Sequence, residues 1–201
     1  MKDVFVVTHA QSEHHVQGVV GGWHDSELTE LGHRQADAIA ARIAELVAAA
    51  RARLYTSDLR RAVQTADPIA ARLGVAARLM PDLREKSFGV AGGRPNAWLD
   101  QCWVPAGSDG DRLDHDEEIE GAETRRELLS RVYRAMDEIL ADPGERAIIV
   151  THGFALTFVI AAWFRLPIEA AGWIGFRPNA GGITHLQQDE RFGDRAHLVG
   201  L

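Results

Sequence analysis

The chain has 201 residues, 46% of them hydrophobic and 25% charged, which is the balance of a globular protein large enough to bury a core. Its formal net charge of −7 at pH 7 argues against nucleic acid as a general partner. The longest apolar stretch, residues 154–164, is too short to span a bilayer, and the apolar run near the N-terminus is too short for a signal peptide.

The first predicted element is an apolar β-branched run, residues 6–8, that is followed by His9. A second run of the same kind, residues 149–151, is followed by His152, and both predict buried parallel strands. Residues 53–56 predict a short strand, and residues 181–201 predict two strands around a turn. The helical period predicts helices over residues 29–48, 58–73, 124–140 and 154–164.

Two residues bear on the start and the continuity of the predicted helices. Thr29 is a plausible N-cap for the first helix, and Pro68 should kink or break the second. The predicted buried face of the first helix consists of Leu31, Ala36, Ile39, Ile43, Leu46 and Val47.

Strands that alternate with helices predict an α/β three-layer sandwich, with a mainly parallel central sheet and helices on both faces. In such sheets ligands bind beyond the carboxyl ends of the strands, where His9 and His152 are expected. We expect residues 1–201 to form a single domain in which about residues 90–123 are an inserted loop region over the site.

Five short motifs follow one another along the chain. They read THAQS at residues 8–12, GWHDSELTELGHRQA at 22–36, SDLRRAVQTA at 57–66, LREKSFG at 83–89 and THG at 151–153. In this order they resemble the motif series of the histidine phosphatase superfamily, the phosphoglycerate-mutase-like proteins. The resemblance covers nearly the whole chain, and five motifs in the right order are a specific signal where one alone would be weak.

The resemblance implies a phosphoryl-transfer site that needs no metal and no organic cofactor. His9 matches the family's nucleophile, which attacks phosphorus and forms a phosphohistidine. Arg61 matches a phosphate-clamping arginine, and His152 matches the second histidine, which donates a hydrogen bond to the phosphate. Glu85 matches the residue that protonates the leaving oxygen and then activates water. Ser12 is expected either to hydrogen-bond the phosphate or to shape its loop.

The first motif departs from the family pattern at positions that should bind phosphate. Thr8 stands where the family has arginine, His15 stands where it has asparagine, and residues 17–21 lack a further arginine that is often present. Losing one preorganised donor costs about 3 kcal/mol, or roughly 100- to 1000-fold in rate. The candidates for supplying the missing positive charge are His14, His15, Arg60 and Arg84.

The motif set favours hydrolysis of a small-molecule phosphomonoester through a phosphohistidine on His9. The loss at Thr8 leaves two alternatives open. One is a phosphate-ligand-binding or regulatory domain that has lost catalysis. The other is acid–base chemistry on a non-phosphorylated substrate in the same pocket. A mutase acting on phosphoglycerate is disfavoured, because a small substrate with two acidic groups would suffer most from missing arginines.

The expected partner is a small phosphorylated metabolite, with neither nucleic acid nor a membrane involved, and a homodimer is compatible with the sequence. The one cysteine, Cys102, excludes an internal disulfide framework and favours a cytoplasmic protein.

Three other features have a simpler interpretation than a functional one. Glu13, His14 and His15 are adjacent, and adjacent residues rarely converge on one metal ion, so we expect no metal site there. Trp98 and Trp103 are better explained by loop packing than by a stacking platform. The acidic run at 109–123 is most simply a solvated surface; if it faced the site, it would repel polyanions.

Overall fold

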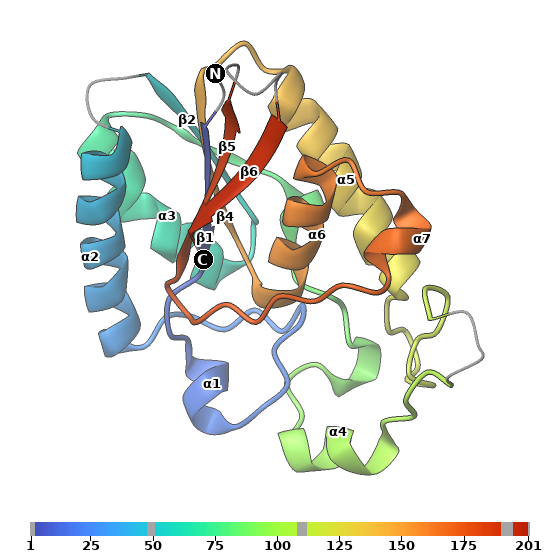
Figure 1. Ribbon diagram of the computed structural model, residues 1–201. Coiled ribbons are helices and arrows are strands. Elements are labelled where there is room, and N and C mark those ends of the chain that lie inside the picture. Colours follow the sequence, from blue (N-terminus) through green and yellow to red (C-terminus); the bar gives the residue numbers. More distant parts are fainter. Residues whose placement is uncertain (1–2, 48–50, 108–111, 190–194, 201) are drawn as a thin grey trace.

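The central feature of the protein is a six-stranded sheet in the strand order β3-β2-β4-β1-β5-β6 (Figure 1). The computed structural model describes residues 3–47, 51–107, 112–189 and 195–200. The strands are β1 (Asp3–Thr8), β2 (Ala52–Thr56), β3 (Ala77–Leu79), β4 (Arg146–Thr151), β5 (Ile183–Asp189) and β6 (Arg195–Gly200). Strands β1 to β4 are parallel, whereas β5 is antiparallel to β1 and β6 is antiparallel to β5. The predicted α/β fold with a mainly parallel sheet is confirmed.

Helices cover both faces of the sheet, as the sequence predicts (Figure 1). The longer ones are α2 (Glu30–Val47), α3 (Arg60–Leu73), α5 (Arg125–Ala141) and α6 (Gly153–Trp163). The shorter ones are α1 (Glu13–Gln17), α4 (Asn96–Cys102), α7 (Ile168–Ala171) and the 3₁₀ turns η1 (Pro81–Leu83) and η2 (Gly89–Ala91). Among the described residues, no helix is both long and apolar enough to cross a membrane.

The period-2 alternation of the strands divides the hydrophobic residues into two cores. In β1, Val4 and Val6 face the core under α5, α6 and α7, while Phe5 and Val7 face the core under α2 and α3. Strand β4 alternates in the same way, since Ile149 joins the first core and its neighbours join the second. Burial on both faces explains why these strands are continuous apolar runs rather than alternating ones.

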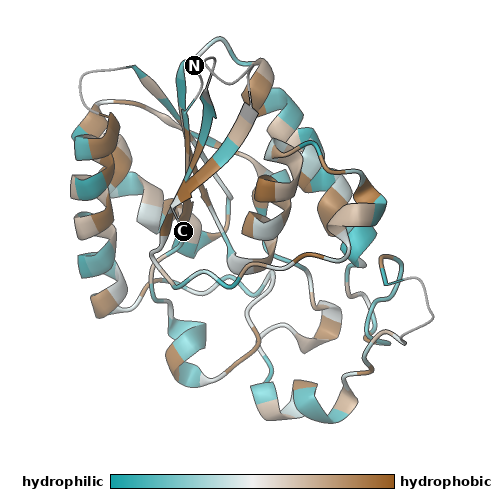
Figure 2. Ribbon diagram, viewed as in Figure 1, coloured by the Kyte–Doolittle hydropathy of each residue, from teal (hydrophilic) through white to brown (hydrophobic). Residues whose placement is uncertain are grey.

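The predicted helices 29–48 and 58–73 correspond closely to α2 and α3, although residue 48 lies outside the described residues. The Thr29 hydroxyl accepts a hydrogen bond from the Gly32 amide at 3.0 Å, as an N-cap does. Pro68 lies inside α3 without breaking it. The predicted apolar face of α2 is wrong at Leu31, which is 43% exposed, because the buried face runs through Gly32, Ala36, Ile39 and Ile43 and Leu31 lies to one side of it. Figure 2 shows α2 with alternating hydrophobic and hydrophilic bands, as expected of a helix with one buried face.

Residues 88–107 and 112–123 lie at the same end of the molecule as α1, as the light green and yellow-green trace in Figure 1 shows. Their apolar side chains form a small core with Val20 around Ala91 and Ile119. Trp98 and Trp103 pack on this core, in keeping with loop packing. The acidic run is predicted over residues 109–123, of which 109–111 lie outside the described residues.

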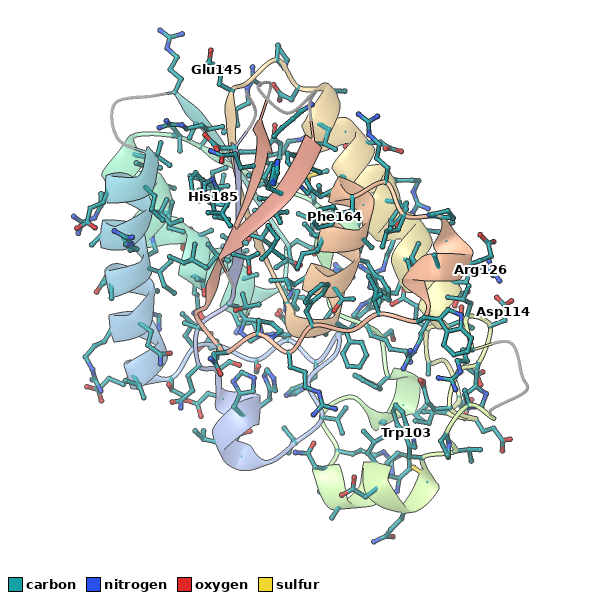
Figure 3. The ribbon with its side chains drawn as sticks, viewed as in Figure 1. Trp103, Asp114, Arg126, Glu145, Phe164 and His185 are labelled. Atoms are coloured by element: carbon teal, nitrogen blue, oxygen red, sulfur yellow. The ribbon has the colours of Figure 1, made fainter. Side chains whose placement is uncertain are left out.

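Several acidic side chains of this run pair within the protein. Asp114 accepts hydrogen bonds from Arg126, and the two side chains lie next to each other at the edge of the molecule (Figure 3). Glu117 forms a buried ion pair with Lys86, and Glu123 forms one with Arg131. These pairs neutralise part of the charge that would otherwise repel an anion.

Candidate active site

The candidate site lies where β1 and β4 end next to each other in the sheet. Thr8 and Thr151 are register partners, so the two Thr-His motifs emerge side by side. The amide of His9 donates to the Thr151 carbonyl at 2.9 Å. The rings of His9 and His152 meet edge to face, with their centroids 5.0 Å apart. Both residues are buried, so the predicted pairing of these histidines is what the fold produces.

The hydrogen bonds of His9 fix its tautomer. Its Nδ1 lies 2.8 Å from the Ala10 carbonyl oxygen, to which it can only donate. Its Nε2 accepts from Nε–H of Arg61 at 3.2 Å. Burial, assisted by the charge of Arg61, lowers the pKa of His9 well below 6.5. The ring is therefore neutral at neutral pH, with the Nε2 lone pair directed toward Arg61.

Arg61 is the fixed cation of the site and is 1% exposed. Its Nη1 donates to the His24 carbonyl at 2.8 Å and its Nη2 donates to the Gly22 carbonyl at 2.6 Å. Burial lowers its pKa to about 10, partly opposed by the charges of Glu85 and Asp25, so the guanidinium remains protonated at neutral pH. Two of its five N–H groups are left for a bound anion.

His152 is fully buried at the start of α6. Its Nε2 lies 2.8 Å from the Ser57 hydroxyl, which follows β2. Its Nδ1 has no hydrogen-bond partner among the described residues. Burial, followed by the charge of Arg61, lowers the pKa of His152 well below 6.5. A buried ring nitrogen without a partner costs about 1–3 kcal/mol, which a bound ligand would recover.

His14, His15 and Ser12 form a contacting group beside His9. The His15 ring stacks on the His9 ring at 5.4 Å, with 10° between the planes. The buried Ser12 hydroxyl contacts Nδ1 of His14 at 2.9 Å and Nδ1 of His15 at 3.3 Å. Burial and the neighbouring His15 lower the pKa of His14 to about 3. Burial, followed by Arg61, lowers the pKa of His15.

We call His9, His14, His15 and His152 the histidine cluster. Nitrogen atoms of the first three lie within 4.8 Å of one another, a spacing at which three ligand atoms could bind one metal ion. The residue that joins His14 and His15 in this group is His9, which follows β1. It is not Glu13, their neighbour in the sequence. However, the guanidinium of Arg61 donates to one of these rings, and its charge opposes a cation there.

Glu85 closes the site from the loop that follows η1. Its carboxylate accepts from the backbone amides of Phe154 at 3.1 Å and Ala155 at 3.3 Å, in the first turn of α6. Burial raises the pKa of this carboxyl, while the amides of Phe154 and Lys86 and the charge of Arg61 lower it. Burial is the larger effect, so the pKa lies above its ordinary value of 4.5.

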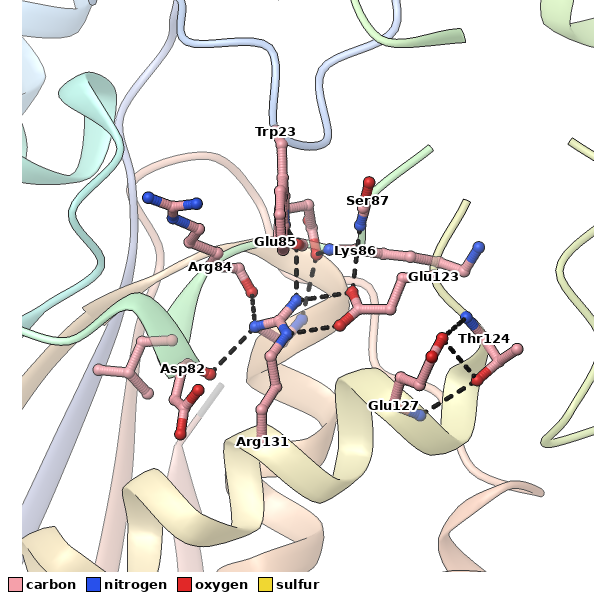
Figure 4. Close-up of polar contacts among 12 residues, drawn as sticks. Trp23, Asp82, Arg84, Glu85, Lys86, Ser87, Glu123, Thr124, Glu127 and Arg131 are labelled. Atoms are coloured by element: carbon pink, nitrogen blue, oxygen red, sulfur yellow. Dashed lines mark hydrogen bonds and ion pairs between the residues drawn. The ribbon is translucent and has the colours of Figure 1, made fainter. Parts of the chain in front are cut away.

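A buried arginine on α5 fixes the backbone of the Glu85 loop (Figure 4). Arg131 donates to the carbonyls of Asp82 at 3.0 Å, Arg84 at 2.6 Å and Glu85 at 2.8 Å. Its remaining donors form a two-pronged ion pair with Glu123 at 2.6 and 2.8 Å. The Trp23 indole also donates to the Glu85 carbonyl, at 2.7 Å. We call Arg131, Glu123 and Trp23 the loop clamp.

The structure brings together His9, Arg61, His152, His15 and Ser12, and the Glu85 carboxylate contacts the start of α6. The Thr8 side chain is instead hydrogen-bonded outside this group. The Thr8 hydroxyl donates to the Asn179 carbonyl at 2.7 Å and accepts from the Gly182 amide at 3.1 Å, which ties the end of β1 to the segment before β5.

Of the residues considered for replacing the missing charge, the two arginines are already occupied. Arg60 pairs with Glu27, and Arg84 pairs in two places with Asp58. His14 and His15 are therefore the candidates that lie in the site.

Sequence reasoning missed Ser57, Trp23 and Arg131. Ser57 and Trp23 each belong to a matched motif, but the resemblance assigned a role to neither. Arg131 had a detectable signal, because it lies three residues after Leu128 on the buried face of α5, where a charge needs a partner.

Comparisons with known proteins identify the family and the fold. A model of the histidine phosphatase superfamily (branch 1) matches residues 4–196. A curated relative named probable phosphoglycerate mutase GpmB, from Yersinia pestis (strain Pestoides F), is 30% identical across 98% of this chain and 95% of its own length. The mycobacterial glucosyl-3-phosphoglycerate phosphatase Rv2419c in complex with VO3 has a TM-score of 0.79, 25% identity, and coverage of 100% and 99% of the two chains. Bacillus stearothermophilus YhfR superposes with a TM-score of 0.78 at 24% identity, covering 99% and 96% of the two chains.

Proposed function

Because this chain belongs to branch 1 of the histidine phosphatase superfamily, we propose that it hydrolyses a small-molecule phosphomonoester through a phosphohistidine on His9. The observation that supports the proposal best is the tautomer of His9, whose Nε2 lone pair is free of a proton and adjacent to a fixed cation. A neutral imidazole in this state is a nucleophile that needs no base to activate it.

In the first step, Nε2 of His9 attacks phosphorus while the bond between phosphorus and the leaving oxygen breaks. Glu85, with its raised pKa, gives its proton to that oxygen. The Arg61 N–H that now meets Nε2 must move to a phosphoryl oxygen, since the lone pair is needed for attack. His152 provides a donor to the same group through the nitrogen that lacks a protein partner.

In the second step, water attacks the phosphohistidine. The Glu85 carboxylate, now ionised, takes a proton from that water, and the bond between Nε2 of His9 and phosphorus breaks. Inorganic phosphate leaves, and the enzyme returns to its starting protonation state. The balance requires no metal and no organic cofactor.

The test is direct trapping of the intermediate. Wild-type protein mixed with a ³²P-labelled phosphomonoester and quenched in base should carry an acid-labile adduct on His9, together with turnover of at least one member of a phosphomonoester panel. His9→Gln should lose both, while His33→Gln, which changes an exposed histidine of α2, should keep both. Absence of both adduct and turnover in wild type would refute the proposal.

A second candidate is a phosphate-ligand-binding domain without turnover, which is favoured by the charge of the site. Arg61 is the fixed cation beside the histidine cluster, and the positions at Thr8 and 17–21 provide none. Vanadate is informative here because the mycobacterial phosphatase Rv2419c was solved in complex with VO3. Stabilisation by vanadate without turnover would favour this candidate. A pocket that rejects vanadate would favour acid–base chemistry on a non-phosphorylated substrate.

A further inference from the structure

A cavity of about 630 Å³ adjoins the candidate active site at the first turn of α6. Its walls are the start of α6 at Gly153 and Phe154, the first residue of α5, Arg125, and the segment 174–178 between α7 and β5. Figure 1 shows that segment passing below the lower end of α6. We call this cavity the Phe154 pocket.

The Phe154 pocket and Glu85 share a wall. The Phe154 amide donates to both carboxylate oxygens of Glu85, and Gly153 lies against the same carboxylate. Glu85 is the group that hands its proton to the leaving oxygen in the proposed reaction. The atoms attached to that oxygen therefore lie near Glu85, and the Phe154 pocket is next to it, because Gly153 and Phe154 both contact the Glu85 carboxylate and line the pocket.

The chemistry of the walls is apolar with two cations. Phe154, Ile174, Phe176 and Pro178 supply the apolar surface, and Phe154 is 40% exposed there. Arg125 and Arg177 supply the charge. Within the described part of the chain neither is in an ion pair, whereas the neighbouring arginines on α5 are paired with Asp114, Glu123 and Asp82. Two uncommitted guanidinium groups beside aromatic rings form a receptor for an anionic, apolar molecule.

We infer that the Phe154 pocket binds the alcohol part of the substrate and selects a ring-sized apolar body that carries a carboxylate. This inference rests on the proposed function. The fork of an arginine matches a carboxylate, and the body lies between the rings of Phe154 and Phe176. The cavity is large for a three-carbon acid, since pockets of roughly 300–1,000 Å³ enclose molecules of drug size.

The substrate class can be tested with two synthetic esters that differ in one group, 4-carboxyphenyl phosphate and 4-carbamoylphenyl phosphate. We expect wild type to favour the carboxylate by about tenfold in kcat/KM, equivalent to ~1.4 kcal/mol. The double variant Arg125→Gln/Arg177→Gln should lose that preference, so that its ratio of kcat/KM for the two esters falls to about one. Arg72→Gln, an exposed arginine on α3, serves as the matched control and should retain the preference. Equal kcat/KM for the two esters in wild type, or a preference that survives in the double variant, would overturn the inference.

A binding measurement separates this inference from the proposed function. The product 4-hydroxybenzoate, added to phosphate-free protein, should raise the melting temperature of wild type more than 4-hydroxybenzamide does, and the double variant should show no difference. If 4-hydroxybenzoate raises the melting temperature more than 4-hydroxybenzamide does but no ester is turned over, the pocket binds carboxylates as inferred and the hydrolase proposal fails. If esters are turned over but the two ligands raise the melting temperature equally, the hydrolase proposal holds and the inference about the pocket fails.

Discussion

The charge state of His9 is decided by its surroundings rather than by its own chemistry. Burial and the neighbouring Arg61 both disfavour a second proton on the ring, and the Ala10 carbonyl holds the first proton on Nδ1. The same two causes act on His152, and burial also lowers the pKa values of His14 and His15. At neutral pH the histidine cluster is therefore uncharged, and the positive charge of the site rests on Arg61.

A bound dianion should raise the pKa values of the histidine cluster and draw protons onto it, because the negative charge favours the charged form of each ring. We expect sulfate, a dianion that does not itself titrate near neutrality, to bind with uptake of about one proton at pH 6.5. Its affinity should rise by up to ~tenfold per pH unit as the pH falls, for each proton taken up. Calorimetry in two buffers of different ionisation enthalpy measures the uptake.

The residue that takes up this proton is expected to be His15, whose ring is exposed on one side and stacked on His9. His15→Gln should reduce the uptake and flatten the pH dependence of sulfate affinity, whereas His33→Gln should change neither. Identical apparent enthalpies in both buffers for wild type would show that the cluster binds the anion without changing its protonation.

The sequence identified the residues that touch the reacting atoms better than those that support them. His9, Arg61 and His152 were found because each carries a chemical group in a recognisable motif. The supporting Ser57 and Arg131 act through contacts that no spacing predicts, since their partners are 95 and about 50 residues away in the chain. The orientation of Thr8 depends on the segment at 179–182, which could not be placed before the fold was known.

At the scale of elements, the loop that carries Glu85 has little structure of its own and is positioned by α5. The loop clamp supplies hydrogen bonds to the carbonyls of residues 82, 84 and 85, and Glu123 also accepts from the Ser87 amide at 3.2 Å (Figure 4). Because Arg131 is 8% exposed at its side chain, its pairing with Glu123 is largely protected from water. Arg131 is thus a positioning residue for Glu85, and it touches no reacting atom itself.

Arg131→Lys should separate positioning from simple stability. A lysine keeps the charge toward Glu123 but cannot span three carbonyls with one ammonium group. The Glu85 carboxyl should then become more exposed, so its pKa should fall toward 4.5 and the alkaline limb of the kcat profile should move to lower pH. We expect kcat to fall by about tenfold or more with little change in phosphate affinity, measured by product inhibition.

The matched control is Arg134→Lys, one turn further along α5 at an exposed ion pair with Asp82. It should leave both kcat and the pH profile unchanged. Glu85→Gln gives the lower limit of kcat, because it removes the titrating group altogether. If Arg131→Lys lowers the melting temperature but leaves the pH profile in place, the clamp is structural and the positioning role is refuted.

The long elements were predictable from periodicity, and the short ones were not. Helices α2, α3, α5 and α6 each span at least three turns, which is enough for an apolar face to recur. Helices α1, α4 and α7 have seven residues or fewer, so a period of 3.6 cannot be recognised in them. They nevertheless matter for function, since α1 carries His14 and His15 into the site.

At the scale of the whole molecule, the site follows from sheet order. Strands β2, β4 and β1 lie next to one another, so Ser57, His152 and His9 emerge together at their carboxyl ends. The repeated Thr-His motif predicts two such strands. That the two strands are neighbours is seen only in the pairing of β1 with β4. Although the chain has a net charge of −7, it places Arg61, Arg125 and Arg177, which form no ion pair with the residues that the structure describes, around one end of its sheet.

The histidine cluster also makes the stability of the whole protein depend on pH. Each of its four pKa values is lower in the folded state than the ordinary 6.5 of the unfolded chain. Below pH 6.5 the unfolded state therefore binds protons that the folded state refuses, and the free energy of unfolding must fall as the pH falls. Each histidine contributes up to about 1.4 kcal/mol per pH unit in that window. Glu85 acts in the opposite sense, because its pKa is raised on folding, but it is one group against four.

We therefore expect the free energy of unfolding, measured with urea at pH 7.5, 6.5, 5.5 and 4.5, to be constant above about pH 7 and to fall steeply below 6.5. His152→Gln should have a shallower slope by close to one proton between pH 6.5 and 5, because a glutamine cannot take up the proton in either state. His33→Gln, which changes an exposed residue, should keep the wild-type slope. Saturating sulfate should reduce the slope in wild type, since the anion lets the folded state bind those protons. A wild-type slope that is unchanged in His152→Gln would mean that the buried site does not govern the acid sensitivity of the fold.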